Sequence, residues 1–377
     1  MTAGWQVKTL GEVIQLPYGK PLDPNDRNPN GLYPAYGANG EKDRTDKFYR
    51  DSPSIIVGRK GSAGEITLTE DRFWPLDVTY FVEFDHLQYD LQFLYYLLVT
   101  LNLPSMAKGV KPGINRSEVY ALPVMVPPLP EQQRIVTLLD EAFDGIATAK
   151  AHAEKNLQNA RAIFESHLQS VFDDQGAGWK CSAFEDAVDS ECTLSYGIVQ
   201  PGEEYAGGMP IVRPTDLGRK TIEIEGLKRI DPALAASYRR TTLRGGDLLL
   251  CVRGTTGQIS IASTELAGAN VTRGIVPIFF EPTVVAQDFG YYLMCSGFVQ
   301  AQIQEKTYGT ALQQINIGDL RKLKLAIPPL AEQAALTAKF DELGKETQRL
   351  ESIYQQKLAA LDALKKSLLH RAFNGAL

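Results

Sequence analysis

The sequence is poor in the side chains on which metal sites, disulfide frameworks and many active sites depend. Its 377 residues include four cysteines and four histidines. No Cys-x-x-Cys spacing occurs, which excludes the common zinc and disulfide frameworks and indicates reduced, buried thiols. The histidines are scattered, with His86 outside the long helical runs and His152, His167 and His370 within them. We therefore expect neither a metal site nor a bound cofactor.

Catalytic motifs are also missing from the sequence. It contains no Gly-x-x-x-x-Gly-Lys phosphate loop, no Gly-x-Gly-x-x-Gly turn, no His-Glu-x-x-His pair and no Gly-x-Ser-x-Gly elbow. The Asn-Pro-Pro-aromatic run with which amino-methyltransferases hold a flipped base does not occur either. Each of these motifs serves a specific chemistry, and the sequence therefore gives no indication of any of these chemistries.

Long apolar runs and a strong charge of one sign are absent as well. The most apolar stretch, residues 91–103, is interrupted by Gln92 and Asn102 and is too short to span a bilayer. The N-terminus lacks a basic region followed by an apolar core, so we expect a cytoplasmic protein without a membrane partner. The net charge of -6 argues mildly against nonspecific coating of nucleic acid, although net charge does not show how the charges are distributed.

What the sequence does contain is a duplication. Residues 127–132 read Pro-Pro-Leu-Pro-Glu-Gln, and residues 328–333 read Pro-Pro-Leu-Ala-Glu-Gln. From these two entries the copies stay in register without a gap to Phe172 and Phe373. Loops tolerate insertions and a continuous helix does not, so the unbroken register predicts one long helix after each entry. Proline at the start of each run agrees, because the first turn of a helix tolerates it.

Apolar residues recur at three- and four-residue steps in both helical runs, as they do in coiled coils. In the first run they are Ile135, Leu139, Ala142, Ile146, Ala149, Ala153, Ala160 and Ile163, and in the second Leu336, Phe340, Leu343, Leu350, Tyr354, Leu361, Leu364 and Leu368. The first set is rich in alanine and the second in larger side chains, and small side chains pack well against large ones. We therefore expect the helices to pair with each other as a coiled coil inside one chain. A pseudo-two-fold duplication would lay them antiparallel.

Two globular segments share a framework. Each has Gly-Trp near its start, at residues 4–5 and 178–179. A Gly-Ser-Ala-Gly turn at residues 61–64 and a Gly-Thr-Thr-Gly turn at residues 254–257 each follow an apolar strand. Between such fixed points the segments diverge, which is typical of one scaffold that serves two related binding functions.

The predicted fold is α+β, with two mixed α/β domains separated by a long antiparallel two-helix coiled coil and an internal pseudo-two-fold duplication. We expect the domains at residues 1–126 and 174–327. The spacer helices are expected at residues 127–173 and 328–377, the first central and the second C-terminal.

The divergent loops carry residue types that suit nucleic acid: lysine and arginine for phosphates and guanine, asparagine and glutamine for adenine, and tyrosine for stacking. In the first segment the candidate DNA-binding residues are Tyr18, Lys20, Tyr36, Asn39, Arg59, Lys60, Ser62, Lys108, Lys111 and Asn115. In the second they are Tyr196, Arg213, Thr215, Arg253, Thr255, Thr256, Tyr308, Thr310, Gln313, Gln314 and Asn316. Arg213 is the preferred base-reading candidate, because arginine makes the commonest bidentate contact to guanine. Each of these residue types also occurs in ordinary solvated loops. For Gly61 and Gly64 the requirements of the turn alone are a sufficient explanation.

These features together resemble the DNA-specificity subunits of Type I restriction-modification systems. The resemblance rests on the Pro-Pro-Leu-x-Glu-Gln entry with its long helix, its return near the chain end, the Gly-Trp openings and the two divergent domains. It covers essentially the whole chain. It implies that residues 1–126 and 174–327 are target-recognition domains, each reading one half of a bipartite sequence in double-stranded DNA, with the coiled coil setting the gap.

The resemblance also implies partners. It implies a non-catalytic subunit that works with two modification (methyltransferase) subunits, which use S-adenosylmethionine, and with restriction (translocase and nuclease) subunits, which use ATP. Two alternatives remain open. The same architecture can serve a methylation-only or Type IIG-like complex with different partners, and a coiled-coil scaffold without any DNA function is the more distant alternative.

Overall fold

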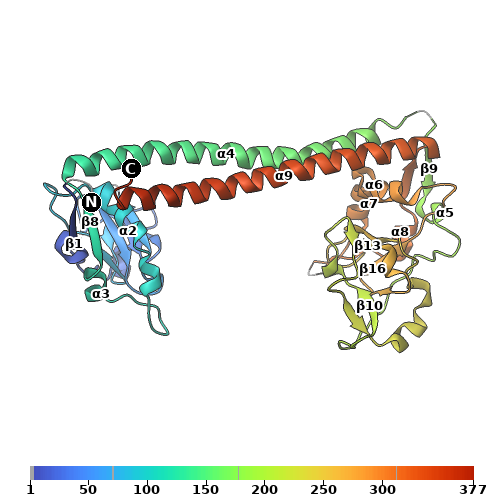
Figure 1. The fold of residues 1–377 in the computed structure, drawn as a ribbon. Helices are drawn as coiled ribbons and strands as arrows, with labels where there is room; N and C mark the ends of the chain where they lie inside the picture. Colours follow the sequence, from blue (N-terminus) through green and yellow to red (C-terminus); the bar gives the residue numbers. More distant parts are fainter. Residues whose placement is uncertain (1–3, 70–71, 177, 311) are drawn as a thin grey trace. The chain divides into compact units, whose positions relative to one another are not determined.

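In a computed structural model, which describes residues 4–69, 72–176, 178–310 and 312–377, the chain divides into two compact units (Figure 1). Unit 1 consists of residues 1–154 and 355–377, and unit 2 consists of residues 155–354. Helices α4 (Leu129–Asp173) and α9 (Leu330–Phe373) each pass from one unit into the other. Each unit therefore combines a globular part with a segment of α4 and a segment of α9.

The described strands of unit 1 form three small sheets. The first sheet pairs β1 (Gln6–Thr9) with β8 (Pro123–Val126). The second has the strand order β3 (Gly40–Thr45), β2 (Tyr33–Gly37), β6 (Trp74–Pro75). The third has the order β5 (Ile66–Thr69), β4 (Ser54–Gly58), β7 (Thr79–Phe81). The short helices and 3-10 turns are α1 (Leu10–Val13), η1 (Pro24–Asp26), α2 (Leu91–Thr100), η2 (Leu103–Met106) and α3 (Arg116–Tyr120). Because β8 ends only a few residues before α4 begins, the antiparallel ribbon of β1 and β8 leads directly into the long helix.

The described strands of unit 2 follow the same plan. The first sheet pairs β9 (Lys180–Ala183) with β17 (Lys324–Ile327). The second has the strand order β12 (Lys228–Ile230), β10 (Met209–Val212), β15 (Asn270–Val271). The third has the order β11 (Thr221–Ile222), β14 (Ile259–Ala262), β13 (Leu248–Cys251), β16 (Ile275–Ile278). The helices are α5 (Phe184–Ala187), α6 (Gln287–Cys295), α7 (Gly297–Lys306) and α8 (Ile317–Arg321), and the 3-10 turns are η3 (Pro214–Asp216), η4 (Pro232–Ser237), η5 (Arg239–Thr241) and η6 (Thr264–Leu266).

The correspondence extends to strand direction. In each unit a fully buried strand, β4 or β13, has antiparallel neighbours on both sides. A second sheet contains one parallel pair, β2 with β6 or β10 with β15. Unit 2 differs by adding β11 parallel to β14 and by having the longer helix α7 where unit 1 has the short turn η2. The predicted duplicated α+β fold is therefore confirmed, with long helices that contact each other.

The repeated glutamine of the Pro-Pro-Leu-x-Glu-Gln entry explains why that entry recurs. Gln132 is fully buried, accepts a hydrogen bond from the backbone N–H of Asp90 at 2.9 Å and donates to the carbonyls of Gln88 and Pro127 at 3.0 and 2.9 Å. Asp90 in turn caps α2, since its side chain accepts from the N–H of Phe93 at 2.9 Å. The glutamine thus joins the start of α4 to the start of α2.

Gln333 makes the same set of bonds in unit 2. It is fully buried, accepts from the N–H of Ala286 at 2.7 Å and donates to the carbonyls of Val284 and Pro328 at 2.9 and 2.8 Å. Ala286 precedes α6 as Asp90 precedes α2. An amide side chain can satisfy one donor and two acceptors at once, so it suits a site where a helix start, a loop and a second helix meet.

The long helices also complete the hydrophobic core of each unit. In unit 1, Ile135, Leu139 and Phe373 are buried with side chains of α2 such as Phe93. In unit 2, the residues Leu168, Phe172, Leu336 and Phe340 are buried with side chains such as Phe289 of α6. The rings of Phe93 and Phe373 lie 5.1 Å apart, and those of Phe172 and Phe289 lie 6.1 Å apart. Each globular part is therefore packed onto both helices.

Inside each unit the two helix segments run antiparallel. Lys150 Nζ lies 2.8 Å from Asp362 Oδ1 in unit 1, and Arg161 Nε lies 3.0 Å from Glu351 Oε2 in unit 2. Residue numbers that increase along α4, from Lys150 to Arg161, thus pair with residue numbers that decrease by the same amount along α9, from Asp362 to Glu351. These exposed pairs set the register more than they add stability, because such ion pairs contribute at most about 1 kcal/mol.

Part of the predicted apolar seam is wrong. Ile163, Leu350 and Leu364 are exposed, whereas Ala153 and Ala160 of the same predicted seam are almost fully buried as expected. A long helix can carry two neighbouring apolar stripes at three- and four-residue steps, and the spacing alone does not show which stripe meets the partner helix.

The prediction of buried cysteines also needs correction. All four thiols are free, but only Cys251 is buried, while Cys192 and Cys295 are partly exposed and Cys181 is exposed. Cys181 lies on β9 of a two-stranded ribbon, where alternate side chains face solvent. In the described part of the chain, no helix has the length and apolar character needed to cross a membrane.

Candidate nucleic-acid interface

Two loops of unit 1 meet and bring six of the predicted residues together. The turn after β4 and the loop of residues 108–113 are joined by a bond from the Gly61 N–H to the Pro112 carbonyl at 2.9 Å. The ends of the loop, Lys108 and Gly113, exchange two backbone hydrogen bonds of 2.9 and 3.1 Å. The candidates that these contacts gather are Arg59, Lys60, Ser62, Lys108, Lys111 and Asn115.

The glycines of the turn are required by the backbone. Gly61 and Gly64 have φ values of +83° and +84°, a region that other residues rarely adopt. A Cβ at Gly64 would lie 2.4 Å from the backbone carbon of Leu103, so the turn packs tightly against η2. These two glycines are therefore needed for the conformation of the turn. The turn positions the neighbouring cations.

Tyr18 lies in a cluster of cations beside this turn. Its side chain is about half exposed, and the guanidinium carbons of Arg59 and Arg116 lie 5.3 and 5.0 Å from its ring centroid. Arg116 also donates to the carbonyl of Leu16 at 3.2 Å. The sequence interpretation omitted Arg116, although its place directly after Asn115 was a usable signal. A half-exposed tyrosine close to two arginines combines an aromatic ring with positive charge.

The remaining candidates of unit 1 lie on neighbouring segments. Tyr36 and Asn39 belong to the β2–β3 hairpin, whose tip approaches the turn so closely that a Cβ at Gly58 would lie 2.6 Å from the Ala38 carbonyl oxygen. Lys20 follows Tyr18, and its ammonium lies 4.7 Å from the ring centroid of Tyr49. The structure therefore brings the predicted residues of unit 1 onto adjoining segments. Tyr36 is the exception to the loop prediction, because it lies within β2 and its ring packs against Phe73 with the centroids 6.0 Å apart.

Unit 2 repeats the meeting of the two loops with different side chains. The Gly254 N–H donates to the Gln313 carbonyl at 2.8 Å, and Tyr308 and Gln314 exchange two backbone bonds of 2.9 Å. Arg253 forms an isolated bridge with Gln314, as Lys60 does with Gly113 in unit 1. The same backbone frame thus presents an arginine and a tyrosine in unit 2 where unit 1 presents Lys60 and Lys108. The two glutamines of unit 2 stand where unit 1 has Pro112 and Gly113.

A Leu-x-Tyr-Gly motif places one tyrosine in each unit. It spans residues 16–19 and 194–197. A Cβ at Gly19 would lie 2.1 Å from a backbone oxygen, and one at Gly197 would lie 2.0 Å from another, so only glycine fits either position. Tyr196 is 43% exposed and donates to the Ile315 carbonyl at 3.3 Å. The repetition of this motif was a signal for the matching positions of the two tyrosines that sequence reasoning missed.

Arg213 lies beside the Arg253 turn but is already engaged. A Cβ at Gly274 would lie 2.6 Å from Pro214 and 3.6 Å from the Arg253 carbonyl oxygen, which places the segment that carries Arg213 and Thr215 next to that turn. Arg213 Nε and Nη2 donate to the carboxylate of Asp216 at 3.1 and 2.8 Å.

This pair has two consequences for Arg213. The hydrogen bonds from its guanidinium to Asp216 raise the pKa of Arg213 above its ordinary value. They also occupy the Nε edge of the guanidinium, so a bidentate contact to guanine requires the Nη1 side or release from Asp216. Arg273, which was not among the predicted residues, is exposed. Its backbone N–H donates to the Ile198 carbonyl at 2.9 Å, which places it beside the segment that carries Tyr196.

Three other candidates of unit 2, Thr255, Tyr308 and Asn316, make intramolecular side-chain hydrogen bonds. Thr255 Oγ1 donates to Gln258 Oε1 at 2.9 Å, and Tyr308 Oη donates to Asn316 Oδ1 at 2.6 Å. Thr256 Oγ1 is buried and has no hydrogen-bond partner among the described residues. It therefore faces the interior, whereas Thr310 and Gln313 are exposed.

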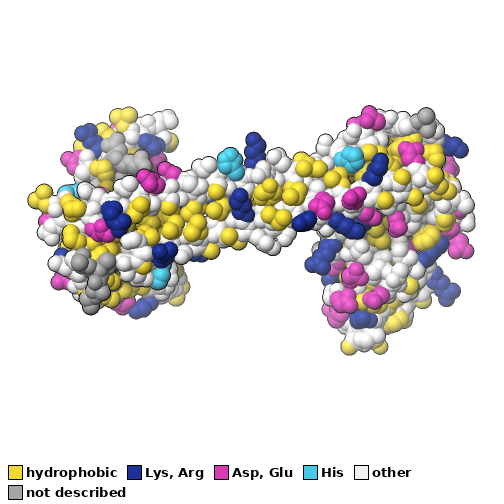
Figure 2. Space-filling view, turned by 45° about the horizontal axis from the view of Figure 1, so that its top comes forward, with side chains coloured by type: hydrophobic (Ala, Val, Ile, Leu, Met, Phe, Trp, Pro, Cys, Tyr) yellow, Lys and Arg dark blue, Asp and Glu magenta, His cyan; other side chains and the backbone are white. Residues whose placement is uncertain are grey.

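Charge is mixed on the surface rather than concentrated. On the face shown in Figure 2, Lys and Arg side chains are interspersed with Asp and Glu side chains on both units. In unit 1 the cations gather locally in the loops described above, and Lys60 and Lys111 are exposed there. The acidic net charge therefore coexists with small basic sites.

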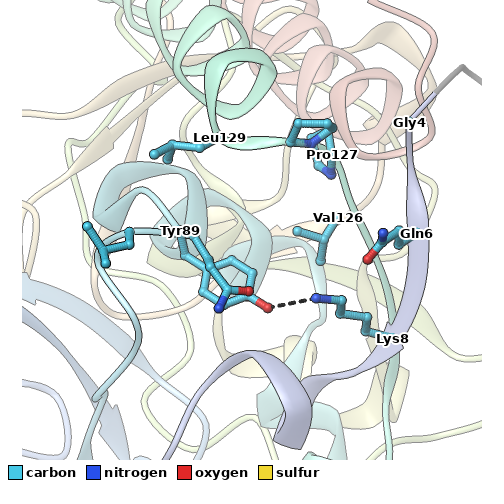
Figure 3. Close-up of a pocket in the computed structure, with 10 residues that line it drawn as sticks. Gly4, Gln6, Lys8, Tyr89, Val126, Pro127 and Leu129 are labelled. Carbon is cyan, nitrogen blue, oxygen red and sulfur yellow. Dashed lines mark hydrogen bonds between the residues drawn. The ribbon is translucent and has the colours of Figure 1, made fainter.

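A pocket at the start of α4 does not belong to these loops. It has a volume of about 300 Å³ and is lined by β1, β8, the loop before α2 and the helix entry (Figure 3). Across it, Lys8 Nζ donates to Tyr89 Oη at 3.0 Å. In the described part of the chain no group of three or more His, Cys, Asp or Glu side chains could hold a metal ion.

Comparison with known proteins gives a consistent result. The family model described as Type I restriction modification DNA specificity domain matches residues 2–158 and again residues 203–359. The chain is 22% identical over 322 residues to the Type I restriction enzyme EcoBI specificity subunit of Escherichia coli, covering 78% of this chain and 68% of that one. It is 21% identical over 409 residues to the MjaVIII specificity subunit of Methanocaldococcus jannaschii, covering 98% and 92% of the two chains.

Solved structures agree on the fold. A chain from a structure described as the basis of complex assembly and conformational transition of the type I R-M system has a TM-score of 0.75 at 19% identity, covering 100% of this chain and 99% of that one. The HsdS subunit of Thermoanaerobacter tengcongensis has a TM-score of 0.63 at 18% identity, covering 100% and 98%. At these identities the likeness shows the fold alone.

Proposed function

Because the chain belongs to the family of Type I restriction-modification DNA specificity subunits, we propose how its two units divide the recognition of DNA. The protein is a non-catalytic specificity subunit with two target-recognition domains. We assign these domains to residues 1–126 and 174–327, and the spacer helices to residues 127–173 and 328–377. Each domain recognises one half of a bipartite sequence in double-stranded DNA.

One observation carries this proposal: the two units hold the same pair of loops by equivalent backbone bonds but line them with different side chains. A conserved frame with changed side chains is what two readers of different base sequences require, because base edges are distinguished by the donors and acceptors that meet them. The lysines of unit 1 suit phosphates and guanine, whereas Gln313 and Gln314 of unit 2 suit adenine.

Exchange of one domain tests the proposal. Residues 1–126 are replaced by the corresponding segment of another specificity subunit, and the methylated motif is read by sequencing the methylome of a host that also makes the modification subunit. We expect one half of the motif to change and the other half to persist. A change in both halves, or in neither, contradicts the assignment of one half-site to each domain.

We further propose that α4 and α9 set the gap between the half-sites. They contain 45 and 44 residues, so each is about 65 Å long at 1.5 Å per residue. Seven residues inserted after Ala149 and seven after Asp362 lengthen both helices at facing positions, because Lys150 pairs with Asp362. A heptad keeps the seam in phase and adds about 10 Å, which equals about three base pairs of DNA.

The expected methylome contains both original half-sites with a gap about three base pairs longer. The level of methylation falls, because the added length also rotates one reader around the duplex. A folded, active variant that keeps the original gap means that another feature of the complex determines the spacing.

The partners follow from the family. The curated relatives are specificity subunits of Type I restriction enzymes. We propose that this chain likewise works with modification and restriction subunits, and that its two similar units bind two modification subunits. A methylation-only complex would use the same DNA contacts without the restriction subunits. Mass measurement of the reconstituted complex tests the ratio, and a stable complex with a single modification subunit contradicts it.

A further inference from the structure

The loop of residues 108–113 carries at its tip a valine, Val110, whose side chain is not packed against the fold. Val110 has 108% of its reference exposure, so its side chain touches no other part of the described chain to any useful extent. The matching loop of unit 2 carries Leu312, which is 46% exposed. A single exposed apolar residue is ordinary on a protein surface. Here, however, the matching loops of both domains each carry an exposed apolar residue, although not at the same position. The equivalent bonds to the carbonyls of Pro112 and Gln313 place Leu312 opposite Lys111.

The loop is held in place rather than loosely attached. Two backbone bonds between Lys108 and Gly113 close it, and the bond from the Gly61 N–H to the Pro112 carbonyl fixes it to the neighbouring turn. Gly109 has a φ of +93°, and its counterpart Gly309 has a φ of +101°. These glycines allow the sharp bend after the first residue of each loop. The tip is therefore presented by a defined backbone.

The surroundings of the tip are cationic. Lys111 follows Val110 directly and is exposed, and Lys60 lies across the bridge to Gly113. Lys108 Nζ lies 2.9 Å from a carboxylate oxygen of Glu118, and its side chain is 72% exposed. An apolar tip next to exposed lysines suits a surface that offers an apolar group close to phosphates, and a DNA groove offers both.

We propose that Val110 is a specificity-determining residue that contacts the C5 methyl group of a thymine in the half-site recognised by unit 1. This inference rests on the proposed function and deepens it. The thymine methyl is the one apolar group that base pairs display in the major groove, and it distinguishes an A·T pair from the others. Lys111 is placed to contact an adjacent phosphate, which positions the tip without reading sequence.

The test uses the full chain in complex with its modification subunit and duplexes that carry the motif determined from the methylome. Each thymine of the unit 1 half-site is replaced in turn by deoxyuridine, which removes only the methyl group. For the unaltered protein we expect one position at which affinity falls about fourfold, the effect of one buried methyl-sized group. Val110→Ala should bind the normal duplex about fourfold more weakly and show no further loss with deoxyuridine at that position.

Controls separate this reading from other roles. Val110→Thr keeps a methyl group at the tip and should retain sensitivity to deoxyuridine. Leu312→Ala should leave the unit 1 half-site unaffected. Thermal unfolding should be unchanged in all variants, because the tip is outside the core.

The inference is overturned if no thymine of that half-site is sensitive, if Val110→Ala stays sensitive, or if that half-site contains no A·T pair. It is equally overturned if Val110→Ala weakens cognate and scrambled duplexes alike, because the valine would then act as a wedge or a nonspecific contact. Failure of the proposed function has a different signature, since the unaltered complex would then bind cognate and scrambled duplexes equally.

Discussion

The two units differ most instructively where a globular part meets a long helix. In unit 1, Tyr96 of α2 donates a hydrogen bond to Asp140 of α4. In unit 2, Tyr292 of α6 donates to the equivalent Asp341 of α9, and a third residue joins them. Lys220 donates to Tyr292 Oη at 2.8 Å and forms an ion pair with Asp341 at 2.5 Å.

The added lysine comes from the divergent part of unit 2. Lys220 lies between η3 and β11, an element without a described counterpart in unit 1. The repeated positions therefore make the contact that both units share, and the divergent segment adds one of its own. This shows that divergence is not confined to the loops proposed to contact DNA but also changes how a domain is held on its helix.

The largest effect should come from the contact that the two units share most closely. Gln132→Ala and Gln333→Ala each remove three hydrogen bonds from a buried site and leave donors and acceptors unpaired, at a cost of about 3 kcal/mol. We expect equal losses, visible as faster amide hydrogen exchange in α2 for the first variant and in α6 for the second. Gln133→Ala, at an exposed neighbouring position, is the matched control. Unequal losses would mean that the two glutamines are not equivalent.

A smaller effect is expected at the preferred base-reading arginine of unit 2. Arg213→Ala should weaken binding to the cognate sequence by about 1–3 kcal/mol and relax one base position of the unit 2 half-site. The unit 1 half-site, measured in the same methylome, is the internal control. An equal loss on cognate and random DNA assigns Arg213 to the phosphate backbone. No loss at all means that its pair with Asp216 is purely structural.

The smallest effect should come from the contact that distinguishes the units. Lys220→Met should lower the stability of unit 2 by about 0.5–1 kcal/mol, a modest value because the ion pair is partly exposed to solvent. Unit 1, which has no such pair in its described part, should be unaffected in hydrogen exchange. Arg219→Met, a change at the exposed neighbour, should have no effect. A loss spread over both units would contradict a local role.

The effect of Lys220→Met should depend on pH. Burial by itself raises the pKa of Asp341, but the hydrogen bonds from Lys220 and Tyr292 outweigh burial and hold that pKa below its ordinary value. A carboxylate with a lowered pKa stabilises the fold above its unfolded pKa of about 4, and this stabilisation is lost as the pH falls below that value. The difference between the variant and the unaltered protein should therefore shrink from pH 7 to pH 3 in denaturant titrations. A constant difference would point to packing rather than charge.

Much of the architecture could be predicted because it is encoded locally. The unbroken register after each Pro-Pro-Leu-x-Glu-Gln entry predicted α4 and α9, since a continuous helix allows no insertion. The glycines at residues 61–64 and 254–257 predicted the turns, since φ values above zero require them. The duplicated fold followed from these matching segments.

The candidate site could be predicted only in part. The candidates were chosen from the sequence by residue type, and most of them lie on adjoining loops in the structure. Their contacts to DNA stay a prediction. The sequence did not show that Thr256 faces the interior or that Arg213 already holds Asp216. Arg116 was missed although it directly follows the candidate Asn115, and the fold then places it against Tyr18. Val110 was missed because a valine does not stand out until the fold leaves its side chain exposed.

What the sequence alone determined about this protein is what depends on neighbours along the chain: helix length, turn geometry and the existence of a repeat. Only the tertiary structure decided which apolar stripe faces the partner helix, why Gln132 and Gln333 recur, and which cations remain available to a ligand. The reason is physical. Burial, pairing and exposure are set by side chains that meet from distant parts of the chain, and spacing within one segment carries no information about them.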